Sequence, residues 1–259
     1  MLIIKEEDLN TLYPLIGYGD EGYVYNYNNE YAIKIFTYCK RKENYNKLKR
    51  KIAKLKDMLN EHDPNCAFPL GFVSFDGTSI DGYYTQLVKH RRQIKDIEDI
   101  ELLRDPAKEI EYLVKADEVL QRLHQKQFIV GDVKQDNILI DRQGNTIYID
   151  TDNYKYKYHT FDLVPDRAGL FYNLYGGTVA SKDNDILVFT IMSLYLLTGN
   201  EKFSTYTHQK EIFTEALREI RLHPEERKEL EYIFSQGRDK PYLGPILQKV
   251  NPNVFRKNT

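Results

Sequence analysis

Short hydrophobic runs alternate with turn residues along the first part of the chain. Positions 13–36 are rich in Tyr, Val and Ile, and glycines and an Asn-Asn pair interrupt them. Aromatic and β-branched runs bounded by such residues are typical of strands joined by tight turns. The pattern therefore predicts three strands within 13–36 and two further strands, at 68–75 and 82–88.

A different spacing follows at positions 45–59 and in most of the chain after Pro106. Hydrophobic residues recur three and four positions apart, which is typical of amphipathic helices, and proline suits a first helical turn. Besides 45–59 and a long helix over 106–123, the spacing predicts helices at 184–197, 210–220, 225–234 and 242–250. We therefore predict an α+β fold with a small β-rich lobe that carries one long helix, and a mainly helical second lobe.

The composition adds no charge asymmetry to this picture. The chain has 259 residues, 41% of them hydrophobic, and its 37 Lys and Arg nearly balance its 39 Asp and Glu. Such a balance gives no global reason to expect a nucleic-acid or anionic-membrane partner. Lysines line the polar faces of the predicted helix 45–59, and a solvated surface explains them more simply than a polyanion site.

The number of cysteines and the length of the apolar runs bear on the cellular compartment of the protein. Cys39 and Cys66 lack the spacing of a metal site or a disulfide scaffold. The N-terminal residues lack the basic and long apolar stretches of a signal peptide. The longest apolar run, at 186–197, has 12 residues, too few to cross a membrane. We expect a cytoplasmic protein without a membrane span, and the sequence predicts no oligomeric state.

Candidate chemistry begins in the glycine-rich turn between the first two predicted strands. Gly17, Gly19 and Gly22 would let the backbone approach phosphates closely, although turn chemistry explains three glycines in a hairpin equally well. The third glycine leads into a strand, whereas a dinucleotide-binding fingerprint would lead into a helix. On the next strand Lys34 either reaches phosphates held under the hairpin or extends to solvent.

Charged residues crowd beside a second apolar run, VGDVKQDNILI at 130–140. Unpaired charges are costly next to a core, so they either pair with one another or bind a charged ligand. Predicted strands at 138–140 and 146–150 form a hairpin, and their ends converge. Asn137 and Asp150 would then supply oxygen ligands to magnesium. Asp132 would accept a hydroxyl proton, and Lys134 would neutralise a phosphoryl group in transit.

These motifs, in this order, resemble the protein-kinase superfamily over nearly the whole chain. The glycine-rich loop matches Gly17, Gly19, Gly22 and Val24, and the VAIK strand matches YAIK, which ends at Lys34. The catalytic-loop pattern D-x-K-x-x-N matches Asp132, Lys134 and Asn137. Asp150 occupies the position of the metal-binding aspartate, and Asp185 that of the aspartate in the central buried helix.

The resemblance implies one bilobal kinase-like domain over 1–259, with lobes at about 1–88 and 89–259. It implies ATP and Mg²⁺ as cofactors and assigns Lys34 to the α- and β-phosphates. Backbone groups near Gln86 and Val88 would meet the adenine edge, between Ala32 and Leu139 on its two faces. Periodicity alone would assign Ala32 and Leu139 to the ordinary core.

Several family features are altered. His-Arg-Asp is replaced by Val-Gly-Asp at 130–132, Asp-Phe-Gly by Asp-Thr-Asp at 150–152, and Ala-Pro-Glu is not recognisable in 169–185. The missing arginine predicts that activation-segment phosphorylation, for example at Thr160 or Thr178, is not the switch. Glu43 is the only acidic residue in 39–56 but lies off the hydrophobic stripe, so its pairing with Lys34 stays open. Asp152 either assists the metal or belongs to a turn.

Three functions follow from the resemblance. The first is an ATP-dependent transfer of γ-phosphate to Ser or Thr hydroxyls of a protein substrate, which Lys134 favours because small-molecule kinases usually lack it. The second is an aminoglycoside- or choline-type small-molecule kinase, favoured by Asp-Thr-Asp. The third is a nucleotide-binding pseudokinase, favoured by the altered motifs. The motifs resemble those of divergent bacterial kinases, so delivery into a host cell as an effector stays an alternative to cytoplasmic action.

Overall fold

The structure is a computed structural model that describes residues 1–19, 21–37, 45–89, 92–97, 105–159, 181–203, 210–235 and 239–255. Its contacts divide the chain into two compact units. Unit 1 comprises Met1–His90 and Ile149–Asp152, and unit 2 comprises Arg91–Tyr148 and Asn153–Thr259. The described residues contain a six-stranded sheet and several helices, which confirms the predicted α+β class.

Unit 1 is built on the six-stranded sheet, in the order β1-β5-β6-β4-β3-β2. Its strands are β1 (Leu2–Ile3), β2 (Leu15–Gly19), β3 (Gly22–Tyr27), β4 (Tyr31–Phe36), β5 (Gly71–Ser74) and β6 (Gly82–Gln86). Only β1 and β5 pair in parallel, and the other neighbours are antiparallel. The five predicted strands are confirmed, whereas β1 is a two-residue strand too short to show a periodicity.

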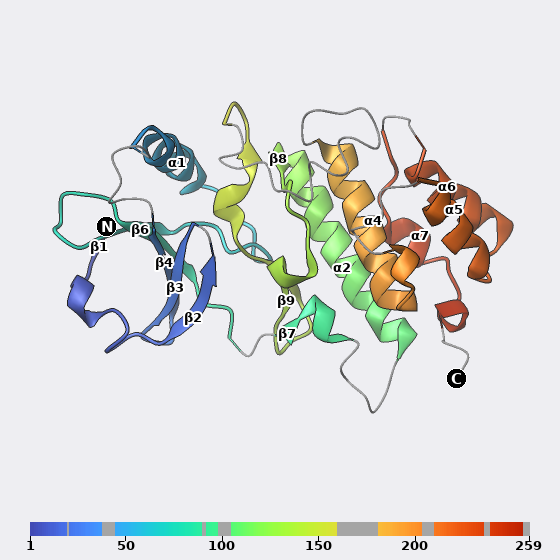
Figure 1. The fold of residues 1–259 in the computed structure, drawn as a ribbon, viewed down its shortest axis with the longest axis horizontal. Coiled ribbons are helices and arrows are strands. Elements are labelled where there is room, and N and C mark those ends of the chain that lie inside the picture. Colours follow the sequence, from blue (N-terminus) through green and yellow to red (C-terminus); the bar gives the residue numbers. More distant parts are fainter. Residues whose placement is uncertain are drawn as a thin grey trace. The chain divides into compact units, whose positions relative to one another are not determined.

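Strand β4 divides its side chains between the two faces of the sheet, because successive residues of a strand point in opposite directions. Ile33 and Ile35 join one buried hydrophobic cluster. Phe36 joins a second cluster that includes Leu55 of helix α1 (Tyr45–Met58). Lys34 alternates with Ile33 and Ile35, so it shares the face of Phe36, against which α1 packs (Figure 1).

Helix α1 confirms the predicted helix but not the predicted role of its lysines. Leu55 and Met58 are fully buried, whereas Tyr45, predicted to dock, is 66% exposed. Lys51 and Lys54 are buried as well, so a solvated surface is the wrong interpretation for these two. For Lys51 the reason is a set of buried carboxylates, described below.

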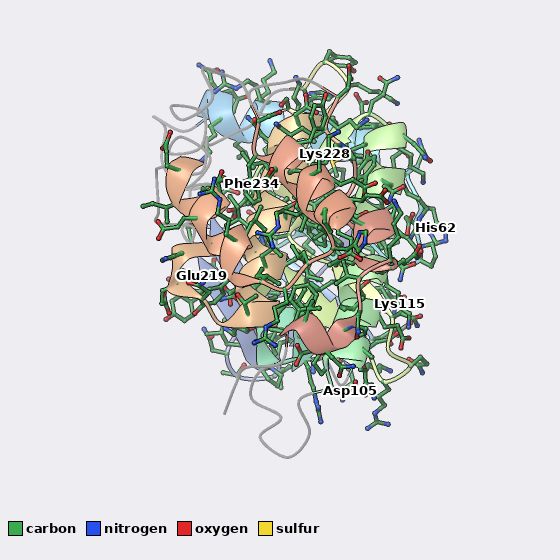
Figure 2. All side chains as sticks on the ribbon, turned by 90° about the vertical axis from the view of Figure 1, so that its right-hand side faces the viewer. His62, Asp105, Lys115, Glu219, Lys228 and Phe234 are labelled. Carbon is green, nitrogen blue, oxygen red and sulfur yellow. The ribbon has the colours of Figure 1, made fainter. Side chains whose placement is uncertain are left out.

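Unit 2 is mainly helical. Its longest helices, α2 (Pro106–Gln125) and α4 (Lys182–Thr198), pack side by side (Figure 1). Asp105, labelled in Figure 2, caps α2 by accepting a hydrogen bond from the amide of Ala107 at 3.1 Å. Among the described residues, the shorter helices are α5 (Lys210–Glu219), α6 (Pro224–Ile233) and α7 (Gly244–Leu247). No helix among the described residues has the length and apolar character needed to cross a membrane.

The predicted helix 242–250 is longer than the observed α7. Pro245 lacks a backbone N–H and fits only the first turn, so the helix begins at Gly244. The helix ends at Leu247, and the amide of Gln248 then donates back to the carbonyl of Gly244 at 3.0 Å. The position of Pro245, which the hydrophobic spacing does not register, therefore sets where this helix begins.

Short strands complete unit 2. Strands β7 (Arg92–Gln93), β9 (Ile138–Ile140) and β10 (Thr146–Tyr148) form one sheet in the order β10-β9-β7. Strands β8 (Phe128–Ile129) and β11 (Lys155–Tyr156) form a separate antiparallel pair. The predicted hairpin is confirmed, because β9 and β10 pair in antiparallel register.

Candidate active site

Lys34 lies in the middle of β4. Its cross-strand neighbours are Val24 of β3 and Tyr83 of β6. Residues directly opposite one another in a sheet point to the same face, so all three side chains lie on the α1 side. Lys34 is only 8% exposed, which excludes the alternative that it extends to solvent. An ammonium buried to this extent requires compensating negative charge.

Two aspartates supply that charge. The Lys34 Nζ donates to Asp150 Oδ1 at 2.5 Å and to the two carboxylate oxygens of Asp152 at 3.0 and 3.2 Å. Both aspartates follow β10 in the short segment that belongs to unit 1. Thr151 anchors this segment, because its hydroxyl donates to the carbonyl of Ala67 at 2.9 Å. Two predicted site residues, Lys34 and Asp150, are therefore in direct contact.

The backbone at Asp150 adopts a left-handed conformation, with φ of 59°. This conformation is uncommon for residues other than glycine, although Asp tolerates it better than most. Sparsely populated conformations of this kind gather at functional sites, where the surrounding structure holds them. The turn lets Asp150 and Asp152 both contact the Lys34 Nζ from one short segment.

Asp152 is fully buried and surrounded by donors. Besides Lys34, Lys51 of α1 lies 2.6 Å from its Oδ2, and the Tyr83 hydroxyl donates to its Oδ1 at 2.7 Å. Burial raises the pKa of a carboxyl, but Lys34 and Lys51 outweigh it and hold the pKa of Asp152 well below its usual range. Asp152 is therefore an ionised partner of two lysines within the short 3-10 turn Thr151–Asn153.

The two lysines and Tyr83 keep their protons at neutral pH. Burial lowers the pKa of both ammonium groups, but the neighbouring carboxylates, Asp152 foremost, raise it above the usual range. Burial also raises the pKa of Tyr83, and the charge of Asp152 adds to that effect. Tyr83 is consequently a hydrogen-bond donor to an ionised carboxylate.

Glu21 extends the cluster to the glycine-rich hairpin. This buried carboxylate, directly before Gly22, contacts Lys51 and lies 3.2 Å from the Nζ of Lys47. Burial alone would raise the pKa of Glu21, but Lys51 outweighs it and lowers that pKa. Sequence analysis missed both Glu21 and Lys51. A usable signal existed, because Lys51 lies three residues after Leu48 and four before Leu55, on the hydrophobic stripe.

The glycines of the hairpin are not equally required by the fold. A Cβ on Gly22 would lie 2.4 Å from the carbonyl oxygen of Ile35, so packing explains this glycine. A Cβ on Gly17 would make ordinary contacts with Val24, and none of the described atoms lies within 4 Å of one on Gly19. Neither Gly17 nor Gly19 has a positive φ. Neither a positive φ nor crowding by described atoms requires these two glycines, and the pairing of β2 with β3 is irregular between Leu15 and Gly17.

The loop before β9 brings three predicted residues of unit 2 together. Lys134 Nζ lies 2.7 Å from Asp132 Oδ2. The Nδ2 of Asn137 donates to the backbone carbonyl of Asp132 at 3.3 Å and approaches its Oδ2 at 3.5 Å. Asn137 is buried, whereas the side chain of Asp132 is 19% exposed. The loop therefore presents a carboxylate that a lysine and an amide hold in place.

Asp185, at the start of α4, fixes the beginning of the same loop. Its two carboxylate oxygens accept hydrogen bonds from the amides of Val130 and Gly131 at 2.7 and 2.8 Å. Gly131 has a φ of 72°, a conformation that favours glycine. His124 Nε2 lies 3.0 Å from the same carboxylate. Gly131, the middle residue of Val-Gly-Asp, thus lies in a left-handed turn at the start of the loop.

The residues assigned to adenine lie in both units. In unit 1, Ala32 is half-buried on β4, and Gln86, at the end of β6, donates from its Nε2 to the carbonyl of Glu30 at 3.1 Å. Val88 is half-buried just after β6. In unit 2, Leu139 is buried on β9. Ala32 and Leu139 thus occupy positions typical of an ordinary core, whereas Gln86 is exposed.

The predicted magnesium ligands also belong to different units. Asp150 keeps 30% of its side chain exposed, and Asn137 directs its Nδ2 to Asp132, so its Oδ1 is the atom that would contact a metal. A carboxylate and an amide oxygen suit Mg²⁺, which usually completes its shell with waters and phosphate oxygens. The described residues contain no group of three or more His, Cys, Asp or Glu that could hold a metal.

Comparisons with known proteins add no family assignment. No family model matches the chain, and no curated protein matches it. Glu43, Thr160, Thr178 and Cys39 lie outside the described residues, as do positions 169–180. The function is therefore inferred from the contacts of Lys34 and of the loop that carries Asp132.

Proposed function

We propose that the protein is a magnesium-ATP-dependent phosphotransferase that moves the γ-phosphate to Ser or Thr hydroxyls of a protein substrate. The observation that carries the proposal is the contact between the buried Lys34 and Asp150, at 2.5 Å. The two residues are 116 positions apart, and each is assigned separately by its motif, Lys34 to the phosphates and Asp150 to the metal. The bilobal arrangement of protein kinases, with lobes at about 1–88 and 89–259, is part of the proposal.

Unit 1 supplies the groups for the phosphates. Lys34 is kept protonated by the neighbouring carboxylates, so it can stabilise negative charge on phosphate oxygens. Gly17 and Gly19 leave room for close approach to the backbone. Asp150 has the exposure to exchange its contact with Lys34 for a metal ion. Magnesium, when bound with the nucleotide, neutralises charge that develops on the phosphates.

Unit 2 supplies the groups for the acceptor. Asp132 is the candidate to orient the hydroxyl and accept its proton, since Lys134 and Asn137 fix the carboxylate. Lys134 is close enough to Asp132 to neutralise charge on the phosphoryl group in transit. A lysine at this place favours Ser or Thr of proteins over small-molecule acceptors, as the motif comparison implies.

The test is transfer of labelled γ-phosphate from magnesium ATP to a cell extract. We expect Asp132→Ala and Asp150→Ala to reduce transfer by at least about 100-fold, the usual scale for a lost catalytic proton acceptor or charge. Asp136→Asn is the matched control, because Asp136 lies on the same loop but only forms an exposed pair with Lys95 at 2.7 Å. Circular dichroism confirms folding of each variant.

The distribution of label separates the proposal from its alternatives. Label on protein that both variants lose supports a protein kinase. Label recovered only on small molecules contradicts the protein acceptor and supports a small-molecule kinase. Nucleotide binding without transfer by the folded wild type contradicts the activity and supports a pseudokinase.

A further inference from the structure

We propose that Asp152 is the residue that positions Lys34 for the nucleotide phosphates, and that Lys51 of α1 and Tyr83 of β6 hold Asp152 in place. This inference rests on the proposed function and names positioning residues for it. Helix α1 would thus contribute a cation to the site, while the acid comes from the segment after β10.

The two aspartates that contact Lys34 differ in solvent exposure, and therefore in the cost of breaking that contact. Asp150 has 30% of its side chain exposed, whereas Asp152 has none. A carboxylate in partial contact with water can turn to a metal or be replaced by phosphate at little cost. Asp152 cannot, because moving it would leave buried charges uncompensated. When a ligand takes Asp150, Asp152 is therefore the carboxylate that still holds Lys34.

The donors around Asp152 fix its orientation from separate elements. Lys51 lies 2.6 Å from Oδ2, and the Tyr83 hydroxyl donates to Oδ1 at 2.7 Å, while Lys34 contacts both oxygens. A strand, a helix and a neighbouring strand thus converge on one carboxylate. Charge-assisted hydrogen bonds of this kind are the stronger ones in proteins, so the position of the carboxylate is well determined.

Charge balance shows what Lys51 does for Lys34. Lys51 lies between Glu21 and Asp152 and compensates part of both carboxylates. Without Lys51, among the described residues, Lys34 would be the remaining cation in contact with Asp152. We then expect Lys34 to be drawn more strongly to Asp152 and less available to a phosphate. The expected defect is weaker nucleotide binding in a protein that still folds.

The experiment measures nucleotide binding and turnover separately. Lys51→Met keeps the aliphatic stem but removes the charge, and Lys49→Met, an exposed lysine of the same helix, is the matched control. We expect Lys51→Met and Asp152→Asn to raise both the dissociation constant for magnesium ADP and the KM for ATP about tenfold, the scale of one lost charged hydrogen bond. Lys49→Met should match the wild type.

Whether a variant changes KM or kcat distinguishes a lost positioning role from damage to the fold. A variant that is partly unfolded has fewer active molecules, which lowers apparent kcat and leaves KM for ATP unchanged. A misplaced Lys34 raises KM for ATP. Should Lys51→Met fail to fold, Tyr83→Phe removes a single hydroxyl from Asp152 and should raise KM for ATP about threefold.

Three failures are distinguishable. Wild-type protein that neither binds nucleotide nor transfers phosphate contradicts the proposed function itself. If the wild-type protein binds nucleotide and Asp152→Asn binds it with the same dissociation constant, the positioning role of Asp152 is overturned. The proposed function is then still intact. Wild-type constants in Lys51→Met with a defect in Asp152→Asn overturn the role assigned to Lys51.

Discussion

Two buried aspartates, Asp152 and Asp117, have pKa shifts in opposite directions because their neighbours differ in charge. Asp152 is ionised because two lysines outweigh the cost of burial. Asp117 of α2 forms no lysine or arginine ion pair among the described residues: it accepts hydrogen bonds from the amide of Gly244 at 2.9 Å and from Gln121 at 2.8 Å. Burial raises the pKa of Asp117 to about 6, and these hydrogen bonds only partly oppose the effect.

This shift makes Asp117 a source of pH-dependent stability. The unfolded chain loses the proton near pH 3.8 and the folded protein near pH 6, so between these values the folded state binds more protons and stability falls as pH rises. Relative to the wild type, Asp117→Asn should gain about 2–3 kcal/mol between pH 4 and pH 7. Urea unfolding at several pH values measures the difference. The exposed neighbour Glu118→Gln is the control, and parallel curves for Asp117→Asn and wild type would contradict the assignment.

At the scale of elements, the neighbouring strands β3 and β6 each place a glycine close to the backbone of β4. A Cβ on Gly22 would lie 2.4 Å from the Ile35 carbonyl oxygen, and one on Gly82 would lie 2.1 Å from the Lys34 carbonyl oxygen. Both glycines therefore set how tightly β3 and β6 pair with the strand that carries Lys34.

Alanine substitutions distinguish the crowded glycines, Gly22 and Gly82, from Gly19, where a Cβ would have open space. Gly22→Ala and Gly82→Ala should each destabilise the protein by at least about 1–3 kcal/mol, because backbone must move. Gly19→Ala should leave the melting temperature unchanged within about 1 °C but weaken ATP binding if the hairpin contacts phosphates. Melting curves and nucleotide titrations of the three variants test this. An unstable Gly19→Ala would show that the fold itself requires that glycine.

The elements were predictable to the extent that their signals are local. Strands at 13–36 and the helix α1 follow from glycine punctuation and from hydrophobic spacing. The site was predictable only for residues that belong to motifs, such as Lys34 and Asp150. Lys51 and Glu21 escaped because a lysine on a helix normally faces water, and its carboxylate partners are distant in sequence. The hydrophobic stripe places Lys51 on the buried side of α1, but spacing does not identify the carboxylates that compensate its charge.

At the scale of the whole molecule, the segment Ile149–Asp152 belongs to unit 1 although its flanking residues belong to unit 2. Sequence order does not reveal this exchange, because hydrophobic spacing describes one element at a time. The proposed site residues are correspondingly distributed, with Lys34 and Asp150 in unit 1 and Asp132 in unit 2.

A ligand that binds only the folded chain raises the stability of the whole molecule. At a magnesium-ATP concentration about 100 times the dissociation constant, the expected gain is about 2.7 kcal/mol. For a chain of this size the melting temperature should rise by roughly 5 to 10 °C. Lys34→Met should lose most of the rise. Differential scanning fluorimetry with and without magnesium ATP measures it, and an equal rise in Lys34→Met would contradict the role of Lys34.

The charged cluster around Asp152 also restricts how the sequence can evolve. Removing one member of a buried ion pair leaves an uncompensated charge that costs about 3–5 kcal/mol, a large share of the stability of an ordinary protein. Lys51, Asp152 and Glu21 are each buried. Substitutions that avoid this loss of stability must therefore change several of the three residues together. Drift at single positions is slow under that condition. Among related sequences, we expect the three residues to be inherited or replaced as a group.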